Sequence, residues 1–260
     1  LPFQRSDQYG EIGCKPQGLA ERARLAACAW TVVPLRALAA LMGPVLVVLL
    51  ACSLLPTRTE VVRRTLSICS RAALVVLGFH SINVQIQGYP GTRPRDLLRL
   101  ASKPGATAGI VCNHVSWVDV LVLCWLFGPS FVARAGVKGT PAVGTIARAI
   151  GCLFVSRDGC DKAGGGSKLA DQVCDRMRRT WEAKAPPLAV FAEGTTSNGK
   201  YLLPFRRGAF VAGLPLTVVV LHYDPRARFS PAWESIGGWR HLQLLLSQPS
   251  HKLCVTVLHL

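Results

Sequence analysis

The stretch AGIVCNHVSWVD, residues 108–119, contains the pattern that decides the fold. Its first five residues form a short apolar run, which is the pattern of a buried strand. The polar pair Asn113 and His114 follows, and Ser116 then precedes the apolar run of a helix predicted over 116–127. A buried strand that leads through a short loop into a helix is typical of an α/β domain.

From about residue 88 the chain continues this alternation of short apolar runs and segments with helical periodicity. One helical segment has an apolar stripe at steps of four residues, interpreted as a face that packs in the core: Leu169, Val173, Met177 and Trp181. The predicted strands are 130–133, 152–156, 188–192, 215–223 and 252–258, and the predicted helices are 141–150, 167–183 and 234–247. The expected fold is α/β, with a mixed sheet flanked by helices.

Upstream of this domain, residues 37–57 carry no charge and are bracketed by Arg36 and Arg58. Such a run predicts a transmembrane helix or part of a re-entrant one. The stretch 72–87 begins apolar and then becomes mixed, so it is either the second arm of a membrane hairpin or a lipid-surface helix that leads into a strand. Basic residues lie on both sides of the first segment, so the charge bias of the flanks gives no orientation.

The domain organisation follows from these segments. We expect a polar and basic N-terminal segment at 1–27, a membrane-anchoring helical region at 28–87 and a catalytic domain at 88–260. Because the chain begins at Leu1 and ends just after a predicted strand, we expect it to be a fragment with a truncated C-terminus.

The composition is apolar and basic: half of the residues are hydrophobic, mean hydropathy is +0.32 and the formal net charge is +16. This charge suits an anionic membrane surface or a substrate with phosphates. Nucleic acid is disfavoured as a partner because the basic residues are scattered and no nucleic-acid-binding signature is present. The ten cysteines form no CxxC pair, so we interpret them as buried free thiols rather than zinc ligands.

The strongest candidate for chemistry is the pair His114 and Asp119, five residues apart across the predicted strand-to-helix junction. If the loop before the helix folds back, the carboxylate can hold one imidazole nitrogen and leave the other as a general base. A capping box, with Ser116 as the N-cap and Asp119 in the first turn, explains the same spacing and is compatible with catalysis.

Two further motifs follow in the sequence. In GCLFVSR, which contains Gly151 and Phe154, a strand ends in Arg157, whose guanidinium could bind a phosphate. In FAEGTTS, a strand runs into Glu193 and a loop that could bind a phosphate through backbone N–H groups and hydroxyls: Gly194, Thr195 and Thr196.

A surface arginine and an ordinary polar loop are the alternatives for these two motifs. The GxxxxGK spacing of Gly194 to Lys200 is not a nucleotide-binding loop, because Tyr201 stands where Ser or Thr must hold magnesium.

Together with GLPLTVVV, which contains Pro215 and leads into a strand, these blocks resemble in order the four motifs of the glycerophospholipid acyltransferase family. The resemblance spans about 108–225. The longer run from EGTTSNGKYLLPFRRGAF to FSPAWESIGGW is similar to plant and algal lysophosphatidylethanolamine acyltransferases and to lysophosphatidylcholine acyltransferases. Ala192 departs from the proline that often precedes the glutamate in these enzymes.

The resemblance implies a glycerol-3-phosphate acyltransferase-like fold and a membrane enzyme, in eukaryotes usually of the endoplasmic reticulum, with its catalytic domain facing the cytosol. His114, oriented by Asp119, would deprotonate the free hydroxyl of a lysophospholipid, which would attack acyl-CoA. Arg157, Glu193, Gly194, Thr195 and Thr196 would hold the glycerol-phosphate part, supported by Asn113, Gly151, Phe154 and Pro215. Acyl-CoA is then a co-substrate, and neither a metal nor a cofactor is expected.

Two alternatives stay open at this point. The acceptor could be 1-acylglycerol-3-phosphate (lysophosphatidic acid), with the same chemistry. The chain could instead be a non-catalytic, lipid-binding membrane protein that keeps the acyltransferase shell; the presence of all the motif residues argues against that.

Overall fold

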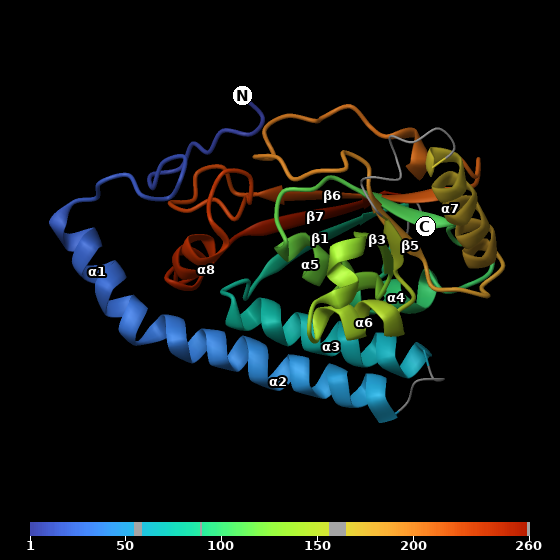
Figure 1. Ribbon diagram of the computed structural model, residues 1–260, viewed down its shortest axis with the longest axis horizontal. Coiled ribbons are helices and arrows are strands. Elements are labelled where there is room, and N and C mark those ends of the chain that lie inside the picture. The colour runs from blue at the N-terminus through green and yellow to red at the C-terminus, as the bar shows by residue number, and fades with distance from the viewer. Residues whose placement is uncertain (55–58, 89, 156–164, 259–260) are drawn as a thin grey trace.

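The computed structural model describes residues 1–54, 59–88, 90–155 and 165–258, and its centre is one seven-stranded sheet (Figure 1). The strand order is β1-β7-β6-β2-β5-β3-β4. The strands are β1 (Ile82–Gln87), β2 (Gly109–Cys112), β3 (Ser130–Arg134), β4 (Leu153–Val155), β5 (Leu188–Phe191), β6 (Leu216–Tyr223) and β7 (Leu253–Leu258).

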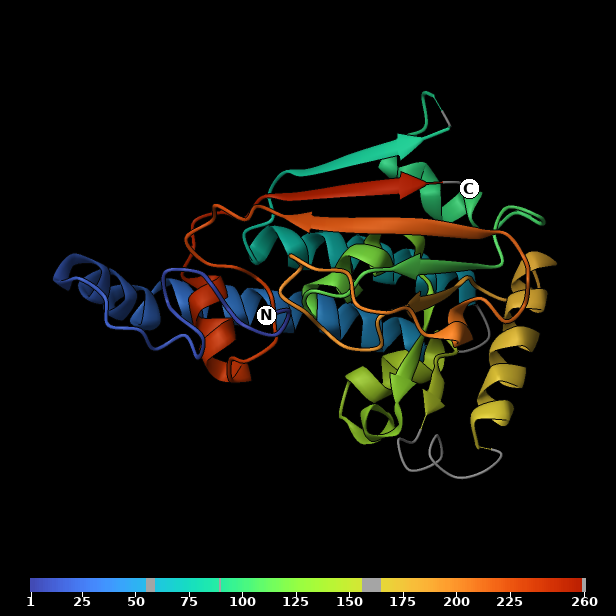
Figure 2. The ribbon, with the colours of Figure 1, turned by 90° about the horizontal axis from the view of Figure 1, so that it is seen from above.

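The sheet is mixed, as expected for a fold like that of the family the motifs resemble. Only the β6–β7 pair is antiparallel among the described strands, and β1 runs parallel to β7 at one edge. The strands from β6 to β4 are parallel, so the carboxyl ends of β6, β2 and β5 lie at the same edge (Figure 2). In open α/β sheets the loops at that edge carry binding and catalytic residues.

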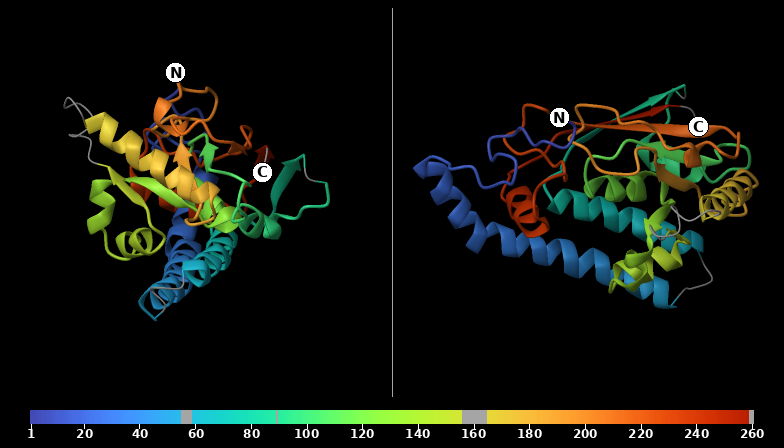
Figure 3. Two further views of the ribbon diagram at one scale, coloured as in Figure 1. Left: turned by 90° about the vertical axis from the view of Figure 1, so that its right-hand side faces the viewer. Right: turned by 45° about the horizontal axis from the view of Figure 1, so that its top comes forward.

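Helices cover both faces of the sheet (Figure 3). The helices are α1 (Leu19–Trp30), α2 (Val32–Leu54), α3 (Thr59–Val76), α4 (Leu97–Leu100), α5 (Val118–Phe127), α6 (Val143–Ala149), α7 (Gly165–Trp181) and α8 (Gly238–Leu246), with short 3-10 turns at Pro94–Asp96, Ala135–Gly139 and Arg207–Ala209. On one face α5 packs against α3, and α2 lies along the outer side of α3. On the other face α7 packs against β2, β4 and β5.

The core follows the alternation of side chains along β2. Ile110 and Cys112 belong to the large apolar cluster that includes α5. On the opposite face, Val173 and Met177 of α7 pack with Leu188, so the predicted apolar stripe of this helix is a core face.

The predicted elements of the catalytic domain are present, with ends shifted by up to four residues. The stretch 72–87 leads from the end of α3, which packs against α2, into the edge strand β1. The choice between a hairpin arm and a lipid-surface helix stays a prediction. The resulting strand alternates half-buried and exposed side chains, as an edge strand with one covered face does.

The apolar segment 37–57 coincides largely with α2, but 55–57 and the side chains of 40–45, 50–52 and 54 lie outside the described residues. Within the described part of the chain, none of the helices is both long and apolar enough to cross a membrane. The membrane segment and the boundaries 1–27, 28–87 and 88–260 stay predictions.

Several arginines around this segment bind helix ends inside the protein. Arg63 is buried and donates to the carbonyls of Phe127 and Gly128 at the end of α5. Arg24 and Arg36 donate to carbonyls at the end of α8. Carbonyls at a helix C-terminus lack partners within the helix and attract positive charge, so part of the basic excess stabilises the fold.

Candidate active site

The carboxylate of Asp119 is fully buried at the start of α5 and accepts hydrogen bonds from four donors. Oδ2 accepts from the backbone N–H groups of Val115 and Ser116, at 2.7 and 2.8 Å, and meets the His114 ring at 3.0 Å. Oδ1 accepts from the hydroxyl of Tyr223 at 2.6 Å. Four donors around one buried carboxylate leave it almost no freedom to move.

His114 lies in the loop between β2 and α5, and its Nδ1 faces Asp119. Because an ionised carboxylate only accepts, Nδ1 carries the proton and Nε2 keeps a lone pair. The ring stacks on Phe191 at the end of β5, with centroids 3.8 Å apart and planes 13° from parallel. The side chain is 19% exposed, so the imidazole is held on two sides and still accessible.

The start of α5 differs from the predicted capping box. The helix begins at Val118, and its N-cap residue, Trp117, makes no side-chain cap. Ser116 accepts from the N–H of Val118 at 3.3 Å, while Asp119 reaches back to the N–H of Ser116. The Asp119 carboxylate therefore accepts a backbone N–H at the start of the helix and also binds the imidazole of His114.

Asn113 and Glu193 fix the loop that carries His114. The Asn113 amide donates to and accepts from the backbone of Leu221 in β6, at 3.0 and 2.8 Å, and so extends the pairing of β2 with β6. Glu193 is buried, and its two oxygens accept from the N–H groups of His114, at 3.4 Å, and Leu203, at 3.1 Å. The third motif is thus tied to the first through the backbone.

The loop after Glu193 makes the predicted tight turn. Gly194 has φ +70°, a left-handed conformation that favours glycine, and a Cβ there would clash with the side chain of Arg206. Thr195 is half-buried. Thr196 donates its hydroxyl proton to the carbonyl of Trp233 at 2.7 Å, so that donor is engaged within the protein.

The remaining motif residues lie farther from this centre or outside the described residues. Gly151 has φ +70° and packs against the guanidinium of Arg176, and Phe154 pairs with Ala133 in the β3–β4 ladder. The carbonyl of Pro215 accepts from the N–H of Ala108 next to β2 and β6. Arg157 lies outside the described residues.

Two contacts of the candidate pair His114 and Asp119 were missed by sequence reasoning. Tyr223 is the last residue of β6, 104 positions from Asp119, and only the β2–β6 pairing brings its hydroxyl to the carboxylate. Burial, the Asp119 charge and their hydrogen bond hold the pKa of Tyr223 well above its usual value, so the hydroxyl stays a donor. Phe191 opens the third motif, but nothing in the sequence indicates that its ring stacks on His114.

The nearby thiol of Cys112 is buried, and burial with the negative charges of Asp119 and Glu193 raises its pKa well above the usual value. A neutral thiol is a poor nucleophile. Eight cysteines whose side chains the structure describes are free thiols, and three of them are buried: Cys69, Cys112 and Cys124. Cys14 is exposed, which corrects the expectation that the thiols are buried throughout.

Comparison with known proteins identifies relatives of this chain. The family model described as Acyltransferase matches residues 99–221, which include all four motifs. The lysophospholipid acyltransferase LPEAT1 of Arabidopsis thaliana is 33% identical over 288 residues, covering 95% of this chain and 71% of the relative. The lysophospholipid acyltransferase LPCAT4 of Homo sapiens is 34% identical over 181 residues, covering 69% of this chain and 31% of the relative.

Among solved structures, the 1-acyl-sn-glycerophosphate acyltransferase PlsC of Thermotoga maritima is similar, with a TM-score of 0.48 and 17% identity, covering 92% of this chain and 83% of that one. The identity with LPEAT1 over nearly the whole chain and the matched domain agree with the resemblance of the motifs. The chain therefore belongs to the acyltransferase family and is an enzyme of the same kind as its lysophospholipid acyltransferase relatives.

Proposed function

We propose that the protein transfers a fatty acyl group from acyl-CoA to the free hydroxyl of a lysophospholipid, either lysophosphatidylethanolamine or lysophosphatidylcholine. One observation carries the mechanism: His114 Nδ1 lies 3.0 Å from a carboxylate that is held by three other donors. A fixed, ionised Asp119 selects the tautomer in which Nε2 is free and stabilises the imidazolium that forms during the reaction.

In this mechanism Nε2 of His114 takes the proton of the acceptor hydroxyl while the hydroxyl oxygen attacks the thioester carbonyl. The tetrahedral intermediate collapses, the carbon–sulfur bond breaks and the CoA thiolate takes the proton back from the imidazolium. The products are a phospholipid and free CoA, and no covalent acyl-enzyme forms. The reaction requires no metal or cofactor.

The glycerol-phosphate part of the acceptor would be bound by the loop from Glu193 to Thr196 and by Arg157. In this assignment Glu193 acts mainly through the backbone of His114, since both of its oxygens accept N–H groups. The lipid substrates place the enzyme at a membrane, and we propose the endoplasmic reticulum with the catalytic domain on the cytosolic side.

The test is a rate measurement with purified protein in detergent micelles, using acyl-CoA and a panel of lysophospholipids. We expect His114→Ala to lower kcat by about 10²- to 10⁴-fold, the usual contribution of a general base. His80→Ala is the matched control, because His80 is exposed and contacts only the carbonyl of Pro249 among the described residues. Turnover that survives His114→Ala would overturn the assignment of the base.

A further inference from the structure

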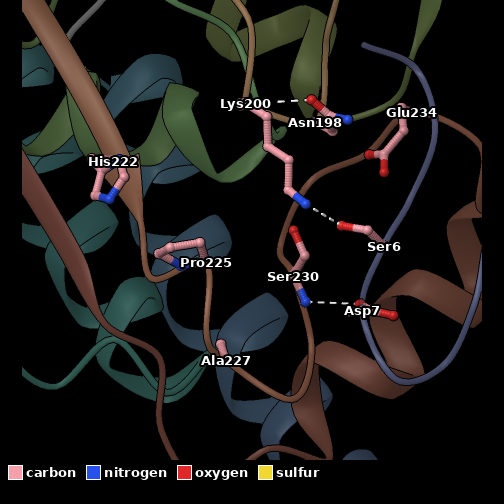
Figure 4. Close-up of a pocket in the computed structure, with 10 residues that line it drawn as sticks. Ser6, Asp7, Asn198, Lys200, His222, Pro225, Ala227, Ser230 and Glu234 are labelled. Carbon is pink, nitrogen blue, oxygen red and sulfur yellow. Dashed lines mark hydrogen bonds between the residues drawn. The ribbon is translucent and has the colours of Figure 1, made fainter. Parts of the chain in front are cut away.

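A cavity of about 290 Å³ lies beside the catalytic loop and is lined by three separate segments (Figure 4). The N-terminal segment contributes Ser6 and Asp7, and the loop after the third motif contributes Asn198 and Lys200. The end of β6 and the segment that follows supply the rest, including His222, Ser230 and Glu234. None of the described lining residues is Trp, Tyr or Phe.

Glu234 is the unusual group in this cavity. Both of its carboxylate oxygens are buried, and neither meets a hydrogen-bond donor among the residues that the structure describes. Burial raises the pKa of Glu234, whereas the positive charge of Arg5 and the nearby backbone N–H of Glu234 itself lower it. That N–H does not reach hydrogen-bond geometry with either carboxylate oxygen. A buried carboxylate without a donor costs free energy, so such a group points to a ligand that supplies one.

The buried cation whose charge acts on Glu234, Arg5, is already engaged within the protein. Arg5 pairs with Asp7, with Nε to Oδ2 at 2.9 Å, and donates to the carbonyls of Ala232 and Ser230. Asp7 in turn accepts from the N–H of Ser230 at 2.8 Å. This network fixes the N-terminal segment against the 230–234 loop. It leaves the Glu234 carboxylate without a hydrogen-bond donor among the described residues.

Lys200 supplies the opposite charge at another part of the same cavity. Its Nζ contacts the hydroxyl of Ser6 at 2.6 Å and forms no ion pair with a described residue. Figure 4 shows no interaction drawn between the Lys200 side chain and the Glu234 carboxylate. Of the two carboxylates that line the cavity, Asp7 is paired with Arg5, so the Lys200 ammonium and the Glu234 carboxylate are the charged groups there without an ion pair among the described residues.

The segments that line this cavity contact the loop that carries His114, through Gly199 of the lining and through Ser197 and Trp233, which adjoin lining residues in the chain. The N–H of Ser197 donates to the carbonyl of His114 at 3.0 Å, and the N–H of Trp233 donates to the carbonyl of Val115 at 2.9 Å. Gly199 packs so closely on Val115 that a Cβ would lie 3.1 Å from its side chain. A ligand in the cavity would thus lie next to the catalytic loop.

We propose that this cavity binds the zwitterionic headgroup of the lysophospholipid acceptor, with Lys200 contacting the same phosphate as the loop after Glu193 and with Glu234 binding a primary ammonium. The inference rests on the proposed function, and it selects ethanolamine over choline. A primary ammonium donates three hydrogen bonds, which is what the Glu234 oxygens lack. A trimethylammonium group donates none and is usually bound by aromatic rings, which the described lining does not provide.

The test compares lysophosphatidylethanolamine, lysophosphatidylcholine and lysophosphatidic acid with one acyl chain and one acyl-CoA. For Glu234→Gln we expect the KM for lysophosphatidylethanolamine to rise about tenfold or more, because a charge-assisted hydrogen bond is lost. Lysophosphatidic acid has no ammonium, so the ratio of kcat/KM for the ethanolamine lipid to that for lysophosphatidic acid should fall by a similar factor. An unchanged ratio would overturn the proposal.

Glu182→Gln is the matched control, since Glu182 is exposed and pairs with Lys184 on the surface. Lys200→Met should raise the KM for all three acceptors, with Lys184→Met as its control. If Glu234→Gln impairs the choline and ethanolamine lipids equally, the assignment of a primary ammonium is wrong. A fall in the melting temperature that parallels the loss for all acceptors would also count against it, because it would indicate a structural role.

The two proposals fail in different ways. If the wild-type protein acylates none of the three acceptors, the proposed function is wrong. If it acylates lysophosphatidylethanolamine and Glu234→Gln keeps the same acceptor ratios, only the headgroup site is wrong.

Discussion

Two carboxylates whose oxygens are buried, those of Asp119 and Glu234, differ in their surroundings. Asp119 accepts four hydrogen bonds, from two backbone N–H groups, an imidazole and a phenol. The oxygens of Glu234 have no donor among the described residues. A carboxylate whose acceptor capacity is used within the protein holds other groups in place, whereas one whose capacity is unused is suited to receiving a ligand. The same chemical group therefore has a positioning role in one region and a proposed binding role in the other.

The largest effect is expected for Asp119→Asn. An amide replaces one acceptor oxygen by an NH₂ group, which would face donors that need an acceptor. We expect kcat to fall on the order of 10³-fold or more and the free energy of unfolding to fall by about 3–5 kcal/mol. Initial rates and urea unfolding measure both quantities, with exposed Asp171→Asn as the control. A stable and active Asp119→Asn protein would contradict the role of this carboxylate.

Acid should weaken the contact between the two regions at His241. This ring accepts from Trp117 Nε1 at 3.2 Å and meets the carbonyl of Pro231 at 2.9 Å. It therefore joins the residue before α5 to the 230–234 loop, which lines the cavity. Burial lowers the pKa of His241 to about 4, and the charges of Arg5 and His251 act in the same direction, against Asp7.

Because the folded pKa lies below the ordinary value of 6.5, the unfolded chain takes up the proton first as the pH falls. The contribution of His241 to the free energy of unfolding is therefore fully present above pH 6.5. It falls by about 3 kcal/mol as the pH drops towards 4. Urea unfolding at pH 7.5 and 4.5 tests this. His241→Gln should reduce the pH dependence, while exposed His80→Gln should leave it as in the wild type. An equal pH dependence in both variants would show that the His241 link is unimportant.

A smaller effect is expected for Tyr223→Phe, which removes one of the four donors to Asp119. We expect a loss of about 1–2 kcal/mol in unfolding free energy and a roughly tenfold lower kcat, because three donors still hold the carboxylate. The high pKa of Tyr223 keeps its hydroxyl protonated, so the effect should be the same at pH 6 and pH 9. Exposed Tyr201→Phe is the matched control, and an effect confined to one end of this pH range would argue against the donor role.

The smallest effect on stability is expected for Glu234→Gln, the same carboxylate-to-amide change as in Asp119→Asn. No hydrogen bond with a described residue is lost, so the unfolding free energy should stay within about 0.5 kcal/mol of the wild type or rise. Thermal unfolding of both variants side by side makes the comparison. A loss as large as that of Asp119→Asn would show that Glu234 has a structural partner.

Most of the sheet could be predicted because each strand is a short apolar run bounded by polar or turn-forming residues. The pattern at 108–112 is local, and so is the helical periodicity that placed Met177 in the core. The start of α5 was predicted about two residues early, because Asp119 rather than the Ser116 hydroxyl alone organises the turn. The order of the strands and the antiparallel β6–β7 pair depend on contacts between distant segments, so no local pattern reports them.

By itself the sequence determined the residue types of the site and their order. It also determined the contact between His114 and Asp119, because the loop and the first helical turn between them are short enough to bring these two side chains together. Only the tertiary structure decided what surrounds them. Tyr223 reaches Asp119 because β6 pairs with β2, and Phe191 lies under His114 because β5 pairs with β2 on its other side. The cavity that holds Glu234 and Lys200 exists because the N-terminal segment folds back onto loops about 200 residues away in the chain, and closures of that length leave no signal in local sequence.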